Sequence, residues 1–268
     1  MEDLGESAAR YFYQDDDFAE KDDKSVVTKI DIETEEGLRK FVTTYFPDDT
    51  IVGEEGEDKN GSSGFVWYLD PIDGTENFVR KIPLFSITAT RLGPTAEGSL
   101  AVVHNPISKQ TFSAFLEDGV FENNNLVKTT KRRVGGRIAV NILSSKVEPW
   151  IQPAKYNLVR DLGLKYGKSG SFSAGLLEFA YVAAGRLDGV VSLNNNPWDT
   201  AAGLYLNKAA GNPISIFAEG VWQPYKGAIK DLYGKTLRER SLLLVSRADL
   251  HKELCDLVGD PKRWADKY

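Results

Sequence analysis

The stretch "FVWYLDPIDGTENF", residues 65–78, decides the predicted fold. Its first five residues are apolar or aromatic, which predicts a central strand covered on both faces. Asp70 and Asp73 follow where that strand ends, and Gly74 permits a close approach of the backbone to a ligand. Thr75 can begin a short helix, whose free N–H groups attract anions. The stretch therefore offers carboxylates for a hard cation beside amides for an anion, which suits a metal ion and a phosphate.

A structural interpretation of the same stretch is a strand-to-helix turn in which Asp73 is the N-cap of the helix. This interpretation accounts for Asp73, but it gives no reason for Asp70 at the end of a buried strand. Two carboxylates three residues apart repel each other. A bound cation would relieve that repulsion, so the pair favours a metal site.

The composition is that of an ordinary soluble globular protein, with 268 residues, 41% hydrophobic and 27% charged. A net charge of −6 argues against non-specific attraction to nucleic acid or to an anionic membrane surface. The single Cys255 excludes an internal disulfide and a cysteine-based zinc site. No apolar run approaches membrane-spanning length and the acidic start "MEDLGESAAR" does not resemble a signal peptide, so we expect a cytoplasmic protein.

Hydrophobic periodicity predicts an α/β protein in two parts. The first part is read as two helices followed by a mostly antiparallel sheet, with a helix within 31–46 and strands at 50–52, 65–69, 84–92, 99–105 and 110–116. The second part alternates strands and helices, with strands at 137–141, 186–193, 213–217 and 241–246 and helices at 172–185, 198–212 and 248–258.

A polar, basic and glycine-bearing stretch, residues 128–136, predicts the boundary between two domains. Residues 1–132 would form the N-terminal helices and the mostly antiparallel sheet, and would carry most of the metal ligands. Residues 133–268 would form a C-terminal α/β subdomain with the last metal ligand and residues on the substrate side.

Further acidic residues stand at the ends of other predicted elements. Glu54 and Glu55 follow a short strand and a glycine, Asp199 opens a helix, and Asp31 stands three residues after Thr28 as in a capping box. Each of these acids alone has an adequate structural explanation, as solvated surface or helix start. Taken together they match Mg²⁺ sites, in which several carboxylates from separate elements hold the ion.

Three segments carry a resemblance to a known family. "GEE" (53–55), "DPIDGTENF" (70–78) and "PWDTAAG" (197–203) resemble the signature segments of the inositol monophosphatase family, the magnesium-dependent and lithium-sensitive phosphomonoesterases. "VVTKID" (26–31) and "LEFAYVAAGRLDG" (177–189) extend the resemblance over nearly the whole chain. The resemblance implies the αβαβα sandwich of the inositol monophosphatase and fructose-bisphosphatase type, usually assembled as a homodimer.

The resemblance also implies a set of metal ligands. Glu54, Asp70 and Asp73 would ligate Mg²⁺ together with the backbone carbonyl of Ile72, and Asp199 would bind the second ion. Two or three ions are implied. The reaction is hydrolysis of a small phosphate monoester by direct attack of a metal-activated water, without a phosphoenzyme.

The remaining roles concern water and substrate. Glu54 and Thr75 would position and activate the attacking water, with Asp31 supporting Thr75 and a third, weaker ion. The amides of Gly74 and Thr75 would hold the phosphate. Asp73 and Asp199 would also face the substrate.

Lys24 and the acidic segment 15–24 have no settled role. Lys24 falls near a basic residue that relatives carry on a loop by the metals, but it lies in the poorly aligning acidic segment 15–24.

One departure from the family pattern leaves the substrate open. Many inositol-specific relatives carry a glutamate seven residues before the last aspartate, where it contacts substrate hydroxyls, and this chain has Ser192 there. Inositol monophosphate remains the first choice, with histidinol phosphate, a sugar phosphate and adenosine 3′,5′-bisphosphate as alternatives. A non-catalytic interaction protein on the same fold is a further alternative, disfavoured because no member of the implied metal set is missing.

Overall fold

Helices and strands alternate in layers through the part of the chain that the computed structural model describes, residues 1–14, 18–20, 26–115, 118–128, 136–142 and 149–265. The α-helices are α1 (Glu2–Phe12), α2 (Lys29–Tyr45), α3 (Thr75–Val79), α4 (Ile151–Tyr166), α5 (Gly175–Ala183), α6 (Ala201–Ala209) and α7 (Ala248–Val258). The described residues also include two 3₁₀ turns, η1 (Ile229–Tyr233) and η2 (Pro261–Trp264).

The first sheet has its strands in chain order. They are β3 (Thr50–Gly53), β4 (Val66–Asp73), β5 (Ser86–Leu92), β6 (Leu100–Asn105), β7 (Gln110–Phe115), β8 (Val120–Glu122) and β9 (Asn125–Leu126). Only the pairing of β3 with β4 is parallel among the described pairs of this sheet, so the expectation of a mostly antiparallel sheet is confirmed. Every residue of β4 is buried, as its apolar sequence predicted.

The second sheet mixes parallel and antiparallel strands. Its spatial order is β11 (Gly167–Gly170), β10 (Gly136–Ile142), β12 (Gly189–Asn195), β15 (Ser241–Ser246), β13 (Ile214–Ala218) and β14 (Val221–Pro224). The pairs among β10, β11 and β12 are parallel, and the others are antiparallel. A separate two-stranded ribbon pairs β1 (Phe18–Glu20) with β2 (Val26–Thr28).

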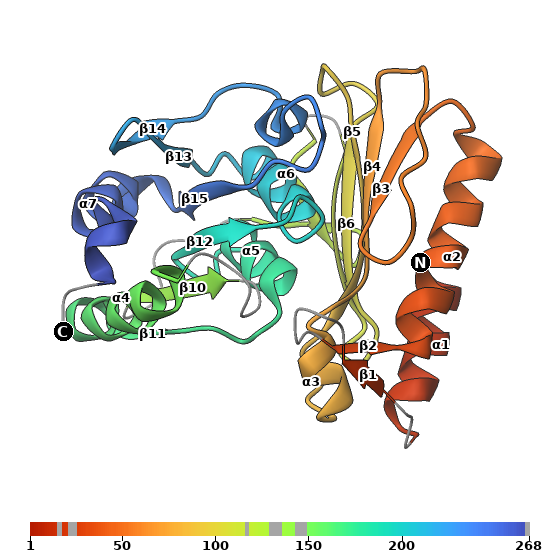
Figure 1. The fold of residues 1–268 in the computed structure, drawn as a ribbon, viewed down its shortest axis with the longest axis horizontal. Coiled ribbons are helices and arrows are strands. Elements are labelled where there is room, and N and C mark those ends of the chain that lie inside the picture. The colour runs from red at the N-terminus through yellow and green to blue at the C-terminus, as the bar shows by residue number, and fades with distance from the viewer. Residues whose placement is uncertain (15–17, 21–25, 116–117, 129–135, 143–148, 266–268) are drawn as a thin grey trace.

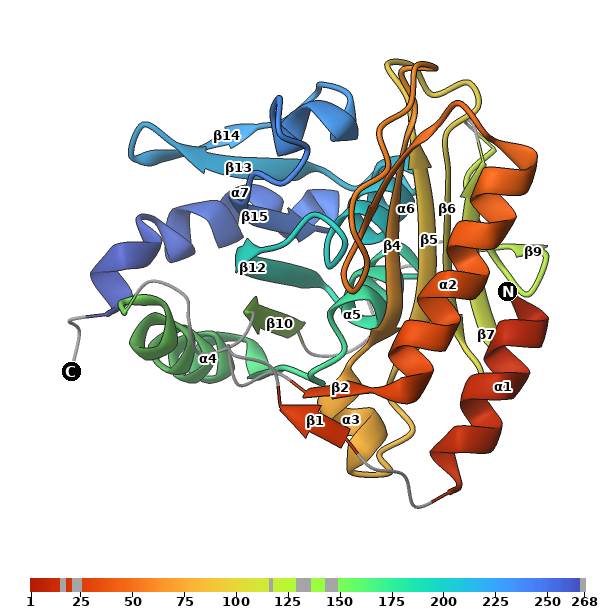
Figure 2. The same cartoon turned by 45° about the vertical axis from the view of Figure 1, so that its right-hand side comes forward.

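The layers run helix, sheet, helix, sheet, helix, which confirms the expected αβαβα sandwich (Figure 1). α1 and α2 cover the outer face of the first sheet, and α4 and α7 cover the outer face of the second (Figure 1). α5 and α6 fill the space between the two sheets (Figure 2). α4 is absent from the elements that the sequence predicts, although Ile151, Ala154, Leu158 and Leu162 form its buried stripe at helical spacing.

The central helices pack closely because α6 carries a glycine where it meets α5. A Cβ atom on Gly203 would lie 2.4 Å from the Cβ of Phe179, so any larger residue would push the helices apart. Phe179 and Leu204 are fully buried in a core cluster that also includes Tyr68 of the first sheet and Val190 of the second. The two central helices thereby fix the distance between the sheets.

The predicted domain boundary at 132/133 lies outside the described residues. Each sheet nevertheless draws its strands from one side of that boundary, since β9 ends the first sheet and β10 begins the second. The division into two domains stays a prediction, although one core cluster joins residues from both sheets. Among the described residues, no helix combines the length and the apolar character that crossing a bilayer requires.

Candidate active site

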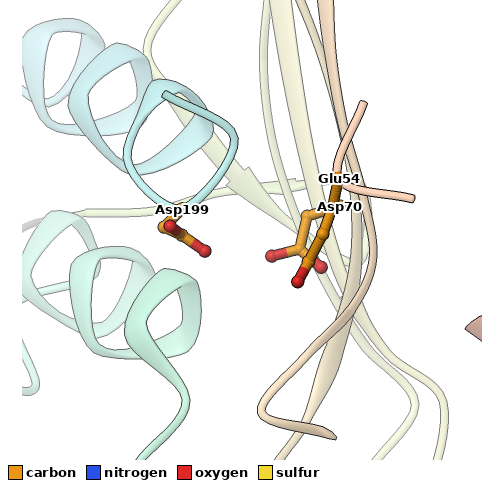
Figure 3. A group of neighbouring side chains, drawn as sticks. All are labelled: Glu54, Asp70 and Asp199. Carbon is orange, nitrogen blue, oxygen red and sulfur yellow. The ribbon is translucent and has the colours of Figure 1, made fainter. Parts of the chain in front are cut away.

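Three carboxylates from distant parts of the chain meet between the first sheet and α6. Oxygens of Glu54, Asp70 and Asp199 all lie within 4.8 Å of one another. Figure 3 shows Glu54 and Asp70 on the side of the first sheet, with Asp199 facing them from the turn before α6. Three acids at this spacing repel one another, and their oxygens are the ligands that hard divalent cations prefer.

Asp70 is the most deeply buried acid of this cluster, with 1% of its surface exposed. Neither of its carboxylate oxygens has a hydrogen-bond donor within the described part of the chain. Burial raises its pKa well above the usual range, and the charges of Glu54 and Asp73 raise it further. Buried carboxylate oxygens without donors cost free energy unless a cation or a proton satisfies them, so the site fits a metal ion.

Asp73 lies close by but has a full set of hydrogen-bond donors. Its Oδ1 accepts from the amide of Gly175 at 3.0 Å, and its Oδ2 accepts from the amide of Leu176 at 2.9 Å. The hydroxyl of Ser86 donates to Oδ2 at 3.2 Å. Burial raises the pKa of Asp73 to about 6, although these hydrogen bonds act in the opposite direction.

The structural interpretation of Asp73 as the N-cap of the helix that follows it is wrong. Gly74 is the N-cap of α3, and the Asp73 carboxylate instead binds the start of α5, far away in the sequence. A shift in strand register between Asp70 and Asp73 separates the surroundings of the two side chains. A direct contact of Asp73 with a metal ion stays a prediction.

Thr75 begins α3, as the sequence predicted, and joins two other candidate residues. Its hydroxyl lies 2.9 Å from the carbonyl oxygen of Ile72 and 3.2 Å from Oδ1 of Asp31. Asp31 is buried at the start of α2, where its other oxygen accepts from the amide and the hydroxyl of Thr28, and so forms the expected capping box. Burial raises the pKa of Asp31 to about 6.

Gly74 allows β4 and α3 to approach the segment before α5. Its φ is 90°, and a Cβ there would lie 3.0 Å from the carbonyl oxygen of Ser173. Asn77 strengthens the same junction, because its amide donates to the carbonyls of Leu84 at 2.8 Å and Phe172 at 2.7 Å. From the sequence, Asn77 could face either the substrate or solvent, and a single asparagine in a short helix offers little signal for this bridging role.

The backbone around Glu54 is held by a buried acid from α2. Oε2 of Glu35 accepts from the amide of Glu55 and Oε1 accepts from the amide of Gly56, each at 2.8 Å. Arg39, one turn further along α2, donates to Glu35 at 2.6 Å. Sequence reasoning missed Glu35, although an acid four residues before an arginine in a predicted helix is a recognisable pair.

Asp199 lies before α6 rather than in its first turn, because the helix begins at Ala201. Its Oδ2 accepts from the amide of Asn196 at 2.9 Å, which holds the turn and aims the carboxylate. Burial raises its pKa to about 7, and the negative charge of Asp73 acts in the same direction.

Two other candidates were Ser192 and Lys24. Ser192 is fully buried in β12, where its hydroxyl accepts from the side-chain amide of Asn195 at 3.0 Å. Its contact with substrate stays a prediction. Lys24 and most of the acidic segment 15–24 lie outside the described residues.

A further buried acid near the site was not recognised from the sequence. Glu178 of α5 is fully buried, and its Oε1 accepts from the amide of Phe172 and from the hydroxyl of Ser171, the latter at 2.9 Å. Its Oε2 has no hydrogen-bond donor among the described residues. Burial raises its pKa to about 7. Glu178 holds the segment that precedes α5, against which Gly74 packs.

Comparison with known proteins agrees with this geometry. The family model described as "Inositol monophosphatase family" matches residues 3–261. The chain belongs to the inositol monophosphatase family. A fructose-1,6-bisphosphatase/inositol-1-monophosphatase of Thermotoga maritima is 34% identical over 200 residues, 73% of this chain and 73% of that protein. The Nus factor SuhB of Escherichia coli strain K12 is 31% identical over 205 residues, 75% of this chain and 76% of that protein.

Solved structures show the same fold. A Thermotoga maritima IMPase has a TM-score of 0.78 at 26% identity, covering 99% of this chain and 96% of that chain. An IMPase/NADP phosphatase complexed with Mg²⁺ and phosphate has a TM-score of 0.69 at 19% identity, covering 94% of this chain and 89% of that chain. At such identity the second likeness is one of fold.

Proposed function

We propose that the protein is a Mg²⁺-dependent phosphatase that hydrolyses a small phosphate monoester by direct attack of water. The observation that carries the proposal is the buried Asp70 carboxylate, which has no hydrogen-bond donor within the described residues and lies beside Glu54 and Asp199. The family supports it, since relatives include a fructose-1,6-bisphosphatase/inositol-1-monophosphatase and an IMPase/NADP phosphatase complexed with Mg²⁺ and phosphate.

The proposed metal ligands are Glu54, Asp70, Asp73 and Asp199 with the carbonyl oxygen of Ile72. They would hold two or three ions, the third and weakest beside Asp31. Bound Mg²⁺ would neutralise the cluster, lower the pKa of a coordinated water and polarise the phosphate oxygens.

The protein's own groups would orient the water and the phosphate. Thr75 donates its hydroxyl hydrogen to Asp31 or to the carbonyl of Ile72, which leaves its oxygen lone pairs to accept a hydrogen bond from the attacking water. Glu54 would accept the single proton that this water loses as it attacks. The amides of Gly74 and Thr75, at the start of α3, would donate to the phosphate oxygens.

The proposed substrate class follows from the family and from one difference from the family's sequence pattern, at Ser192. Inositol monophosphate is the first choice, and histidinol phosphate, a sugar phosphate and adenosine 3′,5′-bisphosphate are the alternatives. The buried Ser192 supports a substrate whose hydroxyls are recognised elsewhere than at that strand. We also propose lithium sensitivity, a cytoplasmic location and a homodimer, in keeping with the family resemblance.

A second candidate function is that of an interaction protein without catalysis. The relatives named Nus factor SuhB, at 30–31% identity, favour it. The net charge of −6 argues against direct binding to nucleic acid, so this candidate would act through a protein partner. The presence of Glu54, Asp70, Thr75 and Asp199 ranks it below the phosphatase.

The test is a phosphate-release screen over inositol, histidinol, sugar and nucleotide phosphates with and without Mg²⁺. We expect activity that requires Mg²⁺, is inhibited by Ca²⁺ or Li⁺, and is abolished in Asp199→Asn. Asp249→Asn, an exposed change on α7, is the matched control and should keep full activity. Full activity in excess chelator, or a wild-type rate in Asp199→Asn, would refute the phosphatase assignment.

A further inference from the structure

Arg238 bridges the two halves of the molecule beside the acidic cluster. It lies in the segment between η1 and β15, and its Nε and Nη2 donate to the two oxygens of Asp58 at 2.9 and 2.7 Å. Asp58 belongs to the segment between β3 and β4 of the first sheet. A planar guanidinium bound at both oxygens of a carboxylate fixes orientation as well as distance.

The Arg238 guanidinium also contacts two residues next to the acidic cluster, one immediately before Glu54 and one immediately before Asp199. Its Nη2 donates to the carbonyl oxygen of Gly53, immediately before Glu54, at 3.4 Å. Its Cζ atom lies 4.9 Å from the ring centre of Trp198, immediately before Asp199. Arg238 thus contacts the backbone next to Glu54 and the side chain next to Asp199.

The backbone beside Arg238 has an uncommon conformation. Leu237 has a φ of 58°, in the left-handed region that bulky residues rarely adopt. Leu237 packs against the core cluster between the sheets. Such a conformation persists where the surrounding structure imposes it. Here it directs Arg238 from one half of the molecule toward the other.

We propose that Arg238 is a positioning residue that sets the separation of Glu54 and Asp199 and thereby the affinity of the cluster for divalent cations. The inference rests on the metal site of the proposed function, and it does not depend on which phosphate ester is hydrolysed. It follows from rigidity, because carboxylates held apart at a fixed distance bind an ion without first being brought together.

A surface ion pair with no positioning role is the competing explanation. The side chains of Arg238 and Asp58 are 40% and 32% exposed, so their bridge alone contributes little to folding stability. The two explanations differ in metal affinity. A bridge that only joins the halves would leave the affinity for a cation unchanged when it is broken.

The molecule contains a matched control for this distinction. Arg186 donates to Glu122 at 2.7 Å, and this bridge also joins the two halves, from the turn after α5 to β8. Its side chains have similar exposures of 34% and 25%. It lies at the opposite end of α5 from the residues that bind Asp73, so it serves as an inter-sheet bridge remote from the cluster.

The experiment titrates the full chain and its variants with Mn²⁺, measuring the free ion by electron paramagnetic resonance, with Mg²⁺ as competitor. We expect Arg238→Gln to weaken cation binding about tenfold, as loss of an outer-shell partner typically does. Arg238→Lys keeps the charge but loses the planar fork, so its affinity should lie in between. Asp58→Asn should weaken binding in the same direction, and Arg186→Gln should bind as the wild type does.

Melting temperatures in chelator accompany each titration and separate folding from binding. Wild-type cation affinity in folded Arg238→Gln and Asp58→Asn, or an equal loss in Arg186→Gln, would overturn the role of Arg238 and leave the proposed function standing. A wild-type chain that binds no divalent cation would contradict both. Weakened binding in the Arg238 variants would support the positioning role even if the phosphate-release screen found no substrate.

Discussion

Asp70 and Asp73 lie three residues apart on β4, yet one carboxylate has no hydrogen-bond donor in the described structure and the other has three. The register shift between them places Asp70 among the acids of the cluster and Asp73 against the start of α5. The same chemical change at the two positions should therefore have opposite effects on the metal-free protein.

Asp70→Asn should make the metal-free protein more stable. The substitution removes a group whose ionisation is opposed by burial and by the charge of Glu54, and the new amide can donate to the neighbouring carboxylates. It should also abolish stabilisation by Mg²⁺, which for the wild type is about 2.7 kcal/mol at a hundred times the dissociation constant. Unfolding in urea with chelator and with Mg²⁺ measures both effects, and a less stable variant in chelator would contradict this account of Asp70.

Asp73→Asn should make the metal-free protein less stable, by about 1–3 kcal/mol. The substitution replaces an acceptor-only group at the start of α5 by an amide whose oxygen can accept from only one of the Gly175 and Leu176 N–H groups, so its NH₂ faces the other. Parallel urea titrations of Asp70→Asn and Asp73→Asn in chelator test the contrast. Equal changes in the free energy of unfolding would show that the two surroundings are energetically alike.

Glu178→Gln should change the pH dependence of stability. Burial raises the folded-state pKa of Glu178 to about 7 from its ordinary 4.5, so the folded state holds this proton more tightly than the unfolded state. Its contribution is favourable at low pH and is lost as the pH rises through about 7. Glutamine keeps an oxygen acceptor for Phe172 and stays neutral, so the variant should equal the wild type below about pH 4 and exceed it at pH 8 by up to about 3 kcal/mol.

Chemical unfolding of Glu178→Gln and the wild type across this pH range, in chelator, measures the difference. A constant difference in free energy of unfolding from pH 5 to pH 8 would show that Glu178 ionises normally in the fold.

Glu35→Gln should weaken cation binding as well as folding. The change weakens the acceptor for the amides of Glu55 and Gly56 and removes the charge that pairs with Arg39, so the backbone at Glu54 loses its anchor. We expect a loss of about 1–3 kcal/mol in stability and a lower Mg²⁺ affinity. The control is Glu33→Gln on the same helix, which breaks only an exposed pair with Lys29. Unchanged Mg²⁺ affinity in Glu35→Gln would assign the residue to folding alone.

Much of the fold could be predicted because its elements carry local patterns. The apolar run before Asp70 predicted the buried strand β4, and the helical spacing around Leu204 predicted α6. Element ends were less certain, since β4 continues to Asp73 and α6 begins only after Asp199. α4 was not predicted, because its apolar residues alternate with charged and aromatic residues that obscure the helical spacing.

By itself the sequence determined which acids stand at the ends of which elements, and the family to which those segments belong. Only the tertiary structure decided which acids share a site. Glu54, Asp70 and Asp199 meet because α5 and α6 set the distance between two sheets, whereas Asp73 is bound by an amide pair a hundred residues away. Glu35, Asn77 and Arg238 act through contacts between segments far apart in the chain, which leave no periodic pattern. Such contacts depend on how the layers pack, and local sequence does not encode that packing.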